Sequence, residues 1–321
     1  MKFFLKSVFV AGIMVFALNL SAQTVDDAGQ KFNAANEQFK ANAFSQAVKL
    51  YEQALKSAKA AGPDAADLQG KIENQLTSAY FKNGISLYRK RQFDQAIAQL
   101  KNSKKMAQVT QNAKFAALAT TYIARVYSTK GLIFIKKKQL PQASAQFAEA
   151  LKVKPNCVNA IYGNSLVARA QGNMTQMMTI IEKLGKMGAT DPRAAKIYAK
   201  AKSIAYKTLL NNGAIELQKE HASKALVYLQ DAAKYHSGTS ILFYYTALAN
   251  LKLSKWSAAI AAANKAVALA KNDKSDMYFT LGQAYQGKGD KTNACKAFKK
   301  VVKGPNVAAA KYQIKQVLKC K

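Results

Sequence analysis

From Asp26 to the C-terminus, apolar residues recur at intervals of three and four, and no stretch alternates with a period of two. This periodicity is typical of amphipathic helices. Turn-forming residues interrupt it at Gly62-Pro63, Gly172-Asn173, Asp191-Pro192, His236-Ser237-Gly238, Gly287–Asp290 and Gly304-Pro305. The pattern therefore predicts an all-α protein whose helices are joined by short turns.

A fixed spacing recurs within this helical pattern. In the segment Gly131–Pro155, the small residue Gly131 is followed twelve positions later by Ala143, and then by Phe147 and Ala150. The twelve-residue spacing also occurs at Ala35/Ala47, Gly84/Ala96, Ser165/Met177, Gly213/Ala225, Ala247/Ala259 and Gly282/Ala294. Because two helices approach closely only where one presents a small side chain, we expect a helical hairpin at each place. Each hairpin must stack on its neighbours to bury its remaining apolar face.

This spacing resembles that of the tetratricopeptide repeat, a helix–turn–helix unit of about 34 residues. The resemblance implies a right-handed α-solenoid of about seven repeats and suggests an exported bacterial member of the family. Three intervals between repeats exceed the usual period by about four helical turns. They predict elongated helices, roughly over Asp64–Arg91, Gln111–Lys138 and Pro192–Lys219.

We expect repeats one to four over residues 26–184 and repeats five to seven over residues 192–303. A boundary between the two groups is expected near Gly185–Asp191, where the pattern is less regular. Residues 305–321 should form a capping helix with a Lys-rich tail. Its apolar positions include Ala309, Tyr312 and Val317.

The N-terminal segment has the pattern of a cleavable signal peptide over residues 1–22. Lys2 and Lys6 precede the apolar run Val8–Leu20, and the small residues Ser21 and Ala22 follow it. The alternative, a transmembrane anchor, requires about 20 apolar residues, which is more than this run contains. We therefore expect export to the periplasm, with an extracellular location as the alternative.

The formal net charge is +32, and most of the excess comes from lysine. Lysine is a hydrated point charge, whereas arginine is the usual residue for reading phosphates and base edges. No acidic residue follows Asp290, although nine lysines do. The composition therefore favours attraction to anionic surfaces over specific binding of nucleic acid.

Cysteines and histidines offer little chemistry. Cys295 and Cys320 are a candidate disulfide in an oxidising compartment, which would leave Cys157 free; three unpaired thiols are the alternative. His221 and His236 are too few for a metal cluster, and no phosphate-binding loop occurs. We expect a protein that is not an enzyme and has no catalytic, cofactor or metal site.

The resemblance also implies that the first helix of each hairpin lines a concave groove. The candidate groove residues lie beside the small residue of the first helix: Phe32, Phe39, Lys40, Phe81, Tyr88, Arg89, Lys136, Tyr162, Arg169, Tyr244 and Lys252. In this hypothesis the aromatics are anchors and the cations select acidic groups. The alternative is that the aromatics pack between hairpins and the cations form a solvated face.

The favoured function is that of a non-enzymatic scaffold or adaptor in the periplasm or at the envelope. It would bind a protein or peptide in this groove, and acidic peptides are among the expected ligands. The Lys/Asn/Arg clamp with which some relatives hold a peptide C-terminal carboxylate is not reproduced in register. The alternative is a Lys-rich binder of anionic glycans or lipid headgroups at the envelope surface. Because surface electrostatics are screened by salt, ionic strength distinguishes the two hypotheses.

Overall fold

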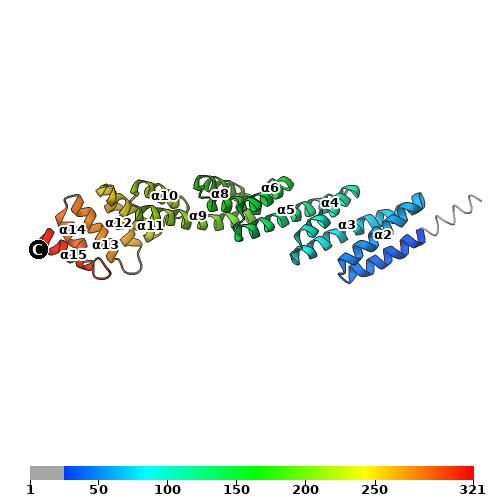
Figure 1. The fold of residues 1–321 in the computed structure, drawn as a ribbon, viewed down its shortest axis with the longest axis horizontal. Helices are drawn as coiled ribbons and strands as arrows, with labels where there is room; N and C mark the ends of the chain where they lie inside the picture. Colours follow the sequence, from blue (N-terminus) through cyan, green and yellow to red (C-terminus); the bar gives the residue numbers. More distant parts are fainter. Residues whose placement is uncertain (1–24) are drawn as a thin grey trace, which may run out of the picture. The chain divides into compact units, whose positions relative to one another are not determined.

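The structure is a computed structural model, and it describes residues 25–321. The predicted signal peptide over residues 1–22 lies outside the described residues. The described chain is helical almost throughout and contains no strand, which confirms the predicted all-α class (Figure 1). It divides into two compact units between Gln171 and Gly172. This division falls before the boundary expected near Gly185–Asp191.

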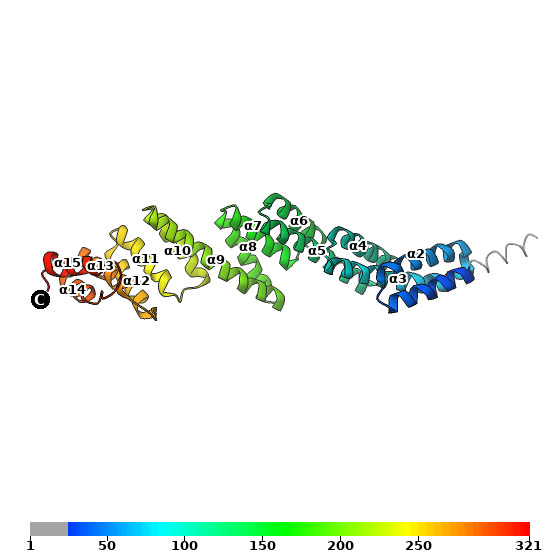
Figure 2. The ribbon, with the colours of Figure 1, turned by 60° about the horizontal axis from the view of Figure 1, so that its bottom comes forward.

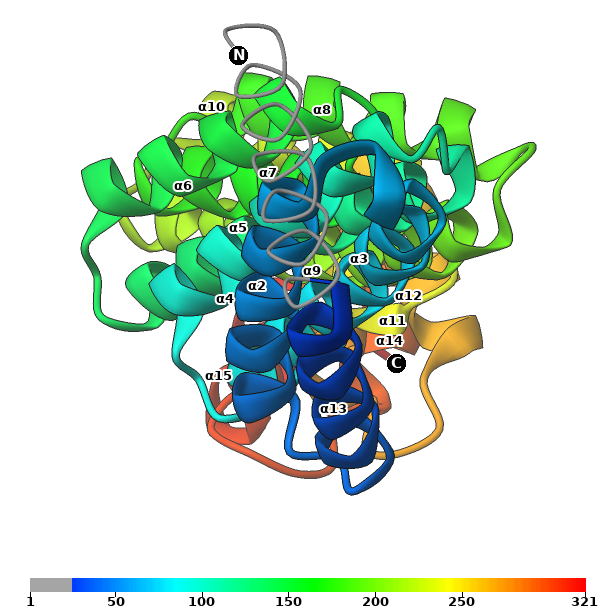
Figure 3. The ribbon, with the colours of Figure 1, turned by 90° about the vertical axis from the view of Figure 1, so that its right-hand side faces the viewer.

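Unit one consists of antiparallel helical hairpins, each joined by a short turn, and one further helix at its end (Figure 2). Its helices are one over residues 25–40, α2 (Phe44–Ala61), the 3₁₀ turn η1 (Gly62–Ala65), α3 (Ala66–Arg89), α4 (Phe93–Val109), α5 (Ala113–Lys136), α6 (Leu140–Val153) and α7 (Val158–Ala170). Figure 3 shows the helix over residues 25–40, in dark blue, beside α2.

Unit two continues the same pattern. Its helices are α8 (Met174–Gly188), α9 (Pro192–Gln218), α10 (Ala222–Tyr235), α11 (Ser240–Lys252), α12 (Trp256–Leu269), α13 (Ser275–Gly287), α14 (Lys291–Lys299), α15 (Val307–Tyr312) and the π-helical turn η2 (Gln313–Val317). Within this unit α8 packs against α9, so the segment Gly185–Asp191 joins two packed helices.

The predicted spacing governs the packing of the hairpins. In the six hairpins that lie within one unit, the second helix begins nine residues after the small residue of the first helix, as at Phe93 after Gly84 and at Leu140 after Gly131. The same spacing along the chain separates Ser165 of α7 from Met174, the first residue of α8. The small residues and their partners twelve positions later are buried. The three elongated helices are confirmed, since α3, α5 and α9 have 24, 24 and 27 residues, whereas α7 has 13.

Each of these six hairpin turns, and the turn between α7 and α8, contains one residue in the left-handed backbone region, two positions before the next helix. Glycine occupies this place only at Gly172 and Gly289. In the other five turns the residues are Asn42, Arg91, Lys138, Glu220 and Ser254, with φ between 54° and 64°. The residue after it donates a backbone hydrogen bond to a carbonyl of the first helix, as Gln139 does to Phe134 at 2.9 Å. This bond closes the end of the first helix.

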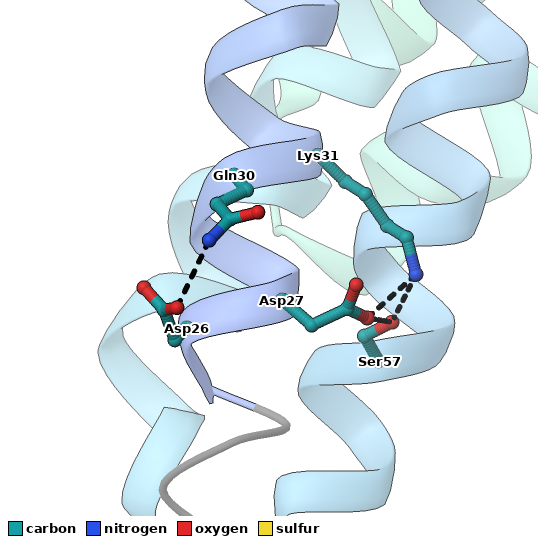
Figure 4. A network of polar contacts seen from close by, with 5 residues as sticks. All are labelled: Asp26, Asp27, Gln30, Lys31 and Ser57. Carbon is teal, nitrogen blue, oxygen red and sulfur yellow. Dashed lines mark hydrogen bonds and ion pairs between the residues drawn. The ribbon is translucent and has the colours of Figure 1, made fainter.

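A polar network fastens the first described helix to the end of α2 (Figure 4). The Lys31 Nζ atom lies 2.5 Å from Asp27 Oδ2 and donates to Ser57 Oγ at 3.1 Å. The Ser57 hydroxyl donates to the same Asp27 oxygen at 2.6 Å. These bonds hold the pKa of the Asp27 carboxyl below its ordinary value, and the hydrogen bond from Lys31 has the largest effect.

The C-terminal segment covers the last hairpin, as expected of a capping helix. Phe298 and Val301 pack with Ala310 and Leu318, and a disulfide joins Cys295 of α14 to Cys320, with a Cα–Cα separation of 5.8 Å. Cys157 is free and buried.

The prediction for the face of this capping helix needs a correction. Ala309, Tyr312 and Val317 are exposed, whereas Ala310 and Leu318 are buried. The segment ends in a π-helical turn, and the helix docks through the small Ala310, so the inward face differs from the one that the pattern suggests.

Candidate functional site

Several candidate groove aromatics of unit one are packed inside it. Phe81 and Tyr162 are only 7% and 5% exposed, so they are not available to a ligand in this structure. Phe32 lies against Tyr51, with ring centroids 5.9 Å apart. These side chains therefore stabilise the stacking of helices, which is the alternative that the sequence left open.

Two further aromatics, Phe39 and Tyr88, are half-buried. The Phe39 ring meets Phe44 of α2 edge-on at 5.5 Å. The Tyr88 hydroxyl lies 3.0 Å from the Thr129 hydroxyl of α5, so it joins the second and third hairpins. Both side chains keep part of their surface accessible while their rings help to position neighbouring helices.

The candidate cations stand near the C-terminal ends of the first helices. Lys40 pairs with Glu37 at 3.0 Å. Arg89 and Lys136 are exposed in the last turns of α3 and α5 and make no ion pair within the described chain. Cations at a helix C-terminus suit the helix dipole, so these two residues have a structural role besides any role in binding.

Arg169 is half-buried in the last turn of α7. Its charge lowers the pKa of Tyr162, but burial of the Tyr162 ring outweighs this effect and raises that pKa above its ordinary value. Arg169 therefore interacts electrostatically with a buried ring.

The two candidates in unit two also have partners. Tyr244 is half-buried, its ring centroid lies 5.7 Å from that of Tyr245, and burial raises its pKa above the ordinary value. Lys252 pairs with Glu220 at 2.6 Å. The Lys252 ammonium lies at the edge of an open depression lined by Glu220, His221, Ala222, Ser223, Lys224, Lys252 and Leu253.

A buried carboxylate, Glu216, contacts two of the residues that line this depression, His221 and Lys224. It is 6% exposed and lies 2.9 Å from His221 Nδ1, 3.4 Å from Lys224 Nζ and 3.7 Å from Lys219 Nζ. The hydrogen bond with His221, followed by the hydrogen bond and charge of Lys224 and the charge of Lys219, holds the pKa of Glu216 below its ordinary value. Because this carboxylate already has three partners, the network is best explained as a structural support for the turn.

The structure reveals an arginine that the sequence analysis did not select. The Arg125 guanidinium lies over the Tyr122 ring of the same helix, with its carbon 4.5 Å from the ring centroid. Its Nε atom is buried and has no hydrogen-bond partner, and the described residues offer the guanidinium no ion pair.

Aromatic rings surround this part of α5. The Phe81 ring of α3 meets the rings of Phe115 and Tyr122 edge-on, at 5.7 and 5.3 Å. The Phe115 and Tyr122 rings keep part of their surface exposed. We refer to Phe81, Tyr88, Phe115, Tyr122 and Arg125 as the Arg125 site.

The side chains of the Arg125 site are of a kind that could bind a carboxylate. A guanidinium presents a planar fork of donors that matches a carboxylate, and stacking on an aromatic ring fixes the orientation of the fork. An unpaired, partly buried cation is unfavourable, so an acidic ligand would supply what the site lacks. The sequence signal that could have found it is the rarity of arginine, which occurs only five times.

Other chemistry receives no support from the part of the chain that the structure describes. Its His, Cys, Asp and Glu residues form no group that could hold a metal ion. None of its helices is both long enough and apolar enough to cross a bilayer.

Sequence comparison identifies two of the hairpins. Residues 124–157, within α5 and α6, and residues 275–303, within α13 and α14, match the model of the tetratricopeptide repeat. These segments are tetratricopeptide repeats, and the chain is an all-α helical-repeat protein that contains them. Such repeats generally belong to non-enzymatic scaffolds for protein–protein interaction. No curated protein sequence matches it.

Solved structures of similar fold are tetratricopeptide repeat proteins. MamA from Desulfovibrio magneticus RS-1 (residues 41 to the end) is 18% identical, with 56% of this chain and 92% of that chain covered and a TM-score of 0.33. YrrB, described as having an unusual peptide-binding site, is 16% identical, with 60% and 92% covered and a TM-score of 0.36. The TPR2AB domain of yeast Sti1, in its pHSP90 complex, is 14% identical, with 92% and 96% covered and a TM-score of 0.33. The likeness concerns the fold alone.

Proposed function

We propose that this protein is an exported, non-enzymatic scaffold that binds an acidic segment of a partner protein on unit one. The observation that carries the proposal is Arg125, whose guanidinium is oriented by Tyr122 but has no carboxylate partner among the described residues. Export rests on the N-terminal sequence pattern, and we place the protein in the periplasm or at the envelope.

The surroundings of Arg125 support a peptide ligand. Tyr122, which contacts the guanidinium, and Phe115 and Tyr88 of the same aromatic cluster retain part of their surface. Accessible aromatic rings anchor peptides well because they bury large areas at little cost in entropy. Arg89 of the neighbouring helix α3 and Lys136 in the last turn of α5 itself are exposed and would attract an acidic segment without fixing its position. The affinity for the acidic segment is expected to depend on Arg125. The rate of association is expected to depend on the exposed cations Arg89 and Lys136.

A second candidate function follows from the charge of the chain. With a formal charge of +32, the surface attracts any polyanion, including anionic glycans and lipid headgroups. Binding of this kind depends on summed charge and falls steeply as salt rises. An oriented guanidinium in a partly buried site is screened much less, so the two functions differ in their response to salt.

The test is capture of partners from an envelope extract, at low and at moderate ionic strength, with identification by mass spectrometry. The wild-type chain is compared with Arg125→Gln and with Arg193→Gln, which removes the same charge from an exposed arginine at the start of α9. We expect a protein that is retained at moderate salt by the wild type and by Arg193→Gln but lost by Arg125→Gln. Equal recovery by both variants would contradict the role of Arg125.

A further inference from the structure

The C-terminal end of unit two is strongly basic. All nine lysines that follow Asp290 are exposed, and none forms an ion pair with an Asp or Glu side chain among the described residues. Lys299 Nζ donates to the main-chain oxygen of Lys321 at 2.7 Å. The segment contains no acidic residue of its own. Its lysines therefore repel one another, and an anionic surface would relieve this repulsion.

Exposed apolar side chains lie among these lysines. Val302, Tyr312 and Val317 are 70%, 59% and 47% exposed. The outer face of a terminal cap is normally polar, because a polar face keeps the end of a repeat array soluble. Lysines alone would satisfy that requirement, so the exposed apolar side chains call for a separate explanation.

The exposure of Val302 follows from a fixed loop. The backbone N–H groups of Val302 and Lys303 donate to the hydroxyl of buried Ser275, at 3.3 and 3.1 Å. Val301, the preceding residue, is buried in the core of the cap. The loop is thus held from one side by a hydrogen-bonded turn and from the other by a packed side chain, with Val302 pointing into solvent.

Tyr312 lies on the outer side of the terminal helix. Ala310 and Leu318 form the inner side, whereas Lys311, Tyr312 and Lys315 are exposed. Positions 311 and 315 are about one helical turn apart, so Lys311 and Lys315 lie on the same side of this segment. The outer side thus combines two cations with an aromatic ring that has a polar hydroxyl.

We infer that this C-terminal cap, defined by Val302, Lys311, Tyr312, Lys315 and Val317, docks on a bilayer that contains anionic phospholipids. Lysines near such a surface contribute about 1 kcal/mol each. The Tyr312 ring suits the interface between headgroups and acyl chains, because its body is apolar and its hydroxyl is polar. An anionic glycan would use the lysines but would leave the valines and the tyrosine without a role, so a lipid surface explains more of the cap.

This surface is separate in sequence from the Arg125 site and does not depend on it. It would place the protein at a membrane while unit one remains free to bind a partner. Failure of either binding activity leaves the other unaffected.

A local probe tests the inference in the full chain. In Tyr312→Trp, the emission of the new tryptophan is followed as vesicles are added, after subtraction of the emission of the wild-type chain, which has a single tryptophan, Trp256. With phosphatidylcholine and phosphatidylglycerol in equal parts we expect a blue shift and a gain in intensity; with phosphatidylcholine alone we expect neither. The N-terminal apolar run is present in every variant and with both vesicle compositions, so its contact with the vesicles does not account for a difference between them.

Charge variants complete the test. Adding Lys311→Gln and Lys315→Gln to Tyr312→Trp should lower the vesicle partition coefficient about thirtyfold. The reason is that two lysines, each of which contributes about 1 kcal/mol near an anionic surface, are lost. The matched control is Lys56→Gln with Lys59→Gln, two exposed lysines of α2, which should leave it nearly unchanged. The inference is overturned if anionic vesicles cause no blue shift, if both pairs weaken partitioning equally, or if a soluble polyanion such as dextran sulfate shifts the emission as much as vesicles do.

Discussion

The Phe147 ring occupies the space in which a Cβ atom on Gly131 would lie. An ideal Cβ at position 131 would be 2.5 Å from Phe147 Cε1, closer than any real contact of this kind. The same ring also fills the space beside Gly163, so one side chain of α6 sets the distance to both α5 and α7. Close packing at this point explains why the repeat requires a small residue in its first helix.

Gly131→Ala should therefore reduce the free energy of unfolding by about 1–3 kcal/mol, because the added methyl group forces Phe147 out of its position. Urea denaturation followed by circular dichroism would measure the loss. Gly70→Ala in α3 is the control, since nothing lies within 4 Å of the added Cβ there. It should raise stability by about 0.5–1 kcal/mol, as alanine is the better helix former.

A double variant separates crowding from other effects at this site. If Gly131→Ala destabilises by displacing the Phe147 ring, then Gly131→Ala combined with Phe147→Leu should lose less stability than the sum of the two single changes. Additive losses would show that the glycine is required for another reason.

The left-handed turn residues give a prediction of opposite sign. Lys138 has φ of 60°, a conformation that is unfavourable for a residue with a Cβ. Lys138→Gly should raise the free energy of unfolding by about 0.5–1 kcal/mol, after allowance for the greater chain entropy of glycine in the unfolded state. Lys137→Gly, at the neighbouring position with φ of −82°, should lower it. Thermal unfolding of both variants provides the measurement, and destabilisation by Lys138→Gly would refute the explanation.

The Asp27 network predicts a dependence of stability on acid pH. The hydrogen bonds from Lys31 and Ser57 lower the pKa of Asp27 in the folded chain. The unfolded state then binds a proton more readily than the folded state does. The stabilisation is thus fully present above the unfolded pKa and is lost as pH falls through the lowered folded pKa.

Asp27→Asn should weaken the attachment of the helix over residues 25–40 at neutral pH. The stability of this attachment should also depend less on pH below the ordinary Asp pKa of 3.8, because the variant has no carboxyl to protonate. Hydrogen exchange of the backbone amides of this helix, measured from neutral to acid pH, would show both effects. Asp26→Asn serves as the comparison, because Asp26 contacts only Gln30 of its own helix in Figure 4. Equal changes from both substitutions would argue against the tie to Ser57.

The disulfide between Cys295 and Cys320 should stabilise the C-terminal cap. The two cysteines are 25 positions apart, so the disulfide closes a loop of that length. Removal of the disulfide should reduce the free energy of unfolding by about 3 kcal/mol. In Cys320→Ser, amide hydrogens of α15 and η2 should exchange faster, whereas those of α9 and α10 should be little changed. Reductant should produce the same effect in the wild type and none in Cys320→Ser; an effect of reductant on the variant would point to another cause.

Most of the helical architecture could be predicted from the sequence. The spacing from Gly84 to Phe93 and Leu100 is set within a single hairpin, because close contact of two helices requires a small residue opposite a bulky one. Elongated helices were predictable for a similar reason, as α3, α5 and α9 continue their apolar period without a break. Local periodicity carries this information because each hairpin packs mainly on its sequence neighbours.

The candidate site was less predictable. Phe32, Phe39 and Tyr88 lie on the expected helices and keep some accessible surface, but Phe81 and Tyr162 are buried. Whether an aromatic residue on a first helix faces a ligand or the next hairpin depends on the neighbour stacked against it, which no spacing within one repeat records.

The sequence by itself determined that the chain is a series of helical hairpins, where their turns fall and which small residues permit their contact, because close packing over short distances leaves a periodic trace. Only the tertiary structure decided that Arg125 has no carboxylate partner among the described residues and that Tyr312 of the capping helix points outward. The pairing of a charge and the outward face of a terminal helix depend on residues brought together by folding. A sequence pattern within one repeat records a contact between two side chains only when both side chains belong to that repeat.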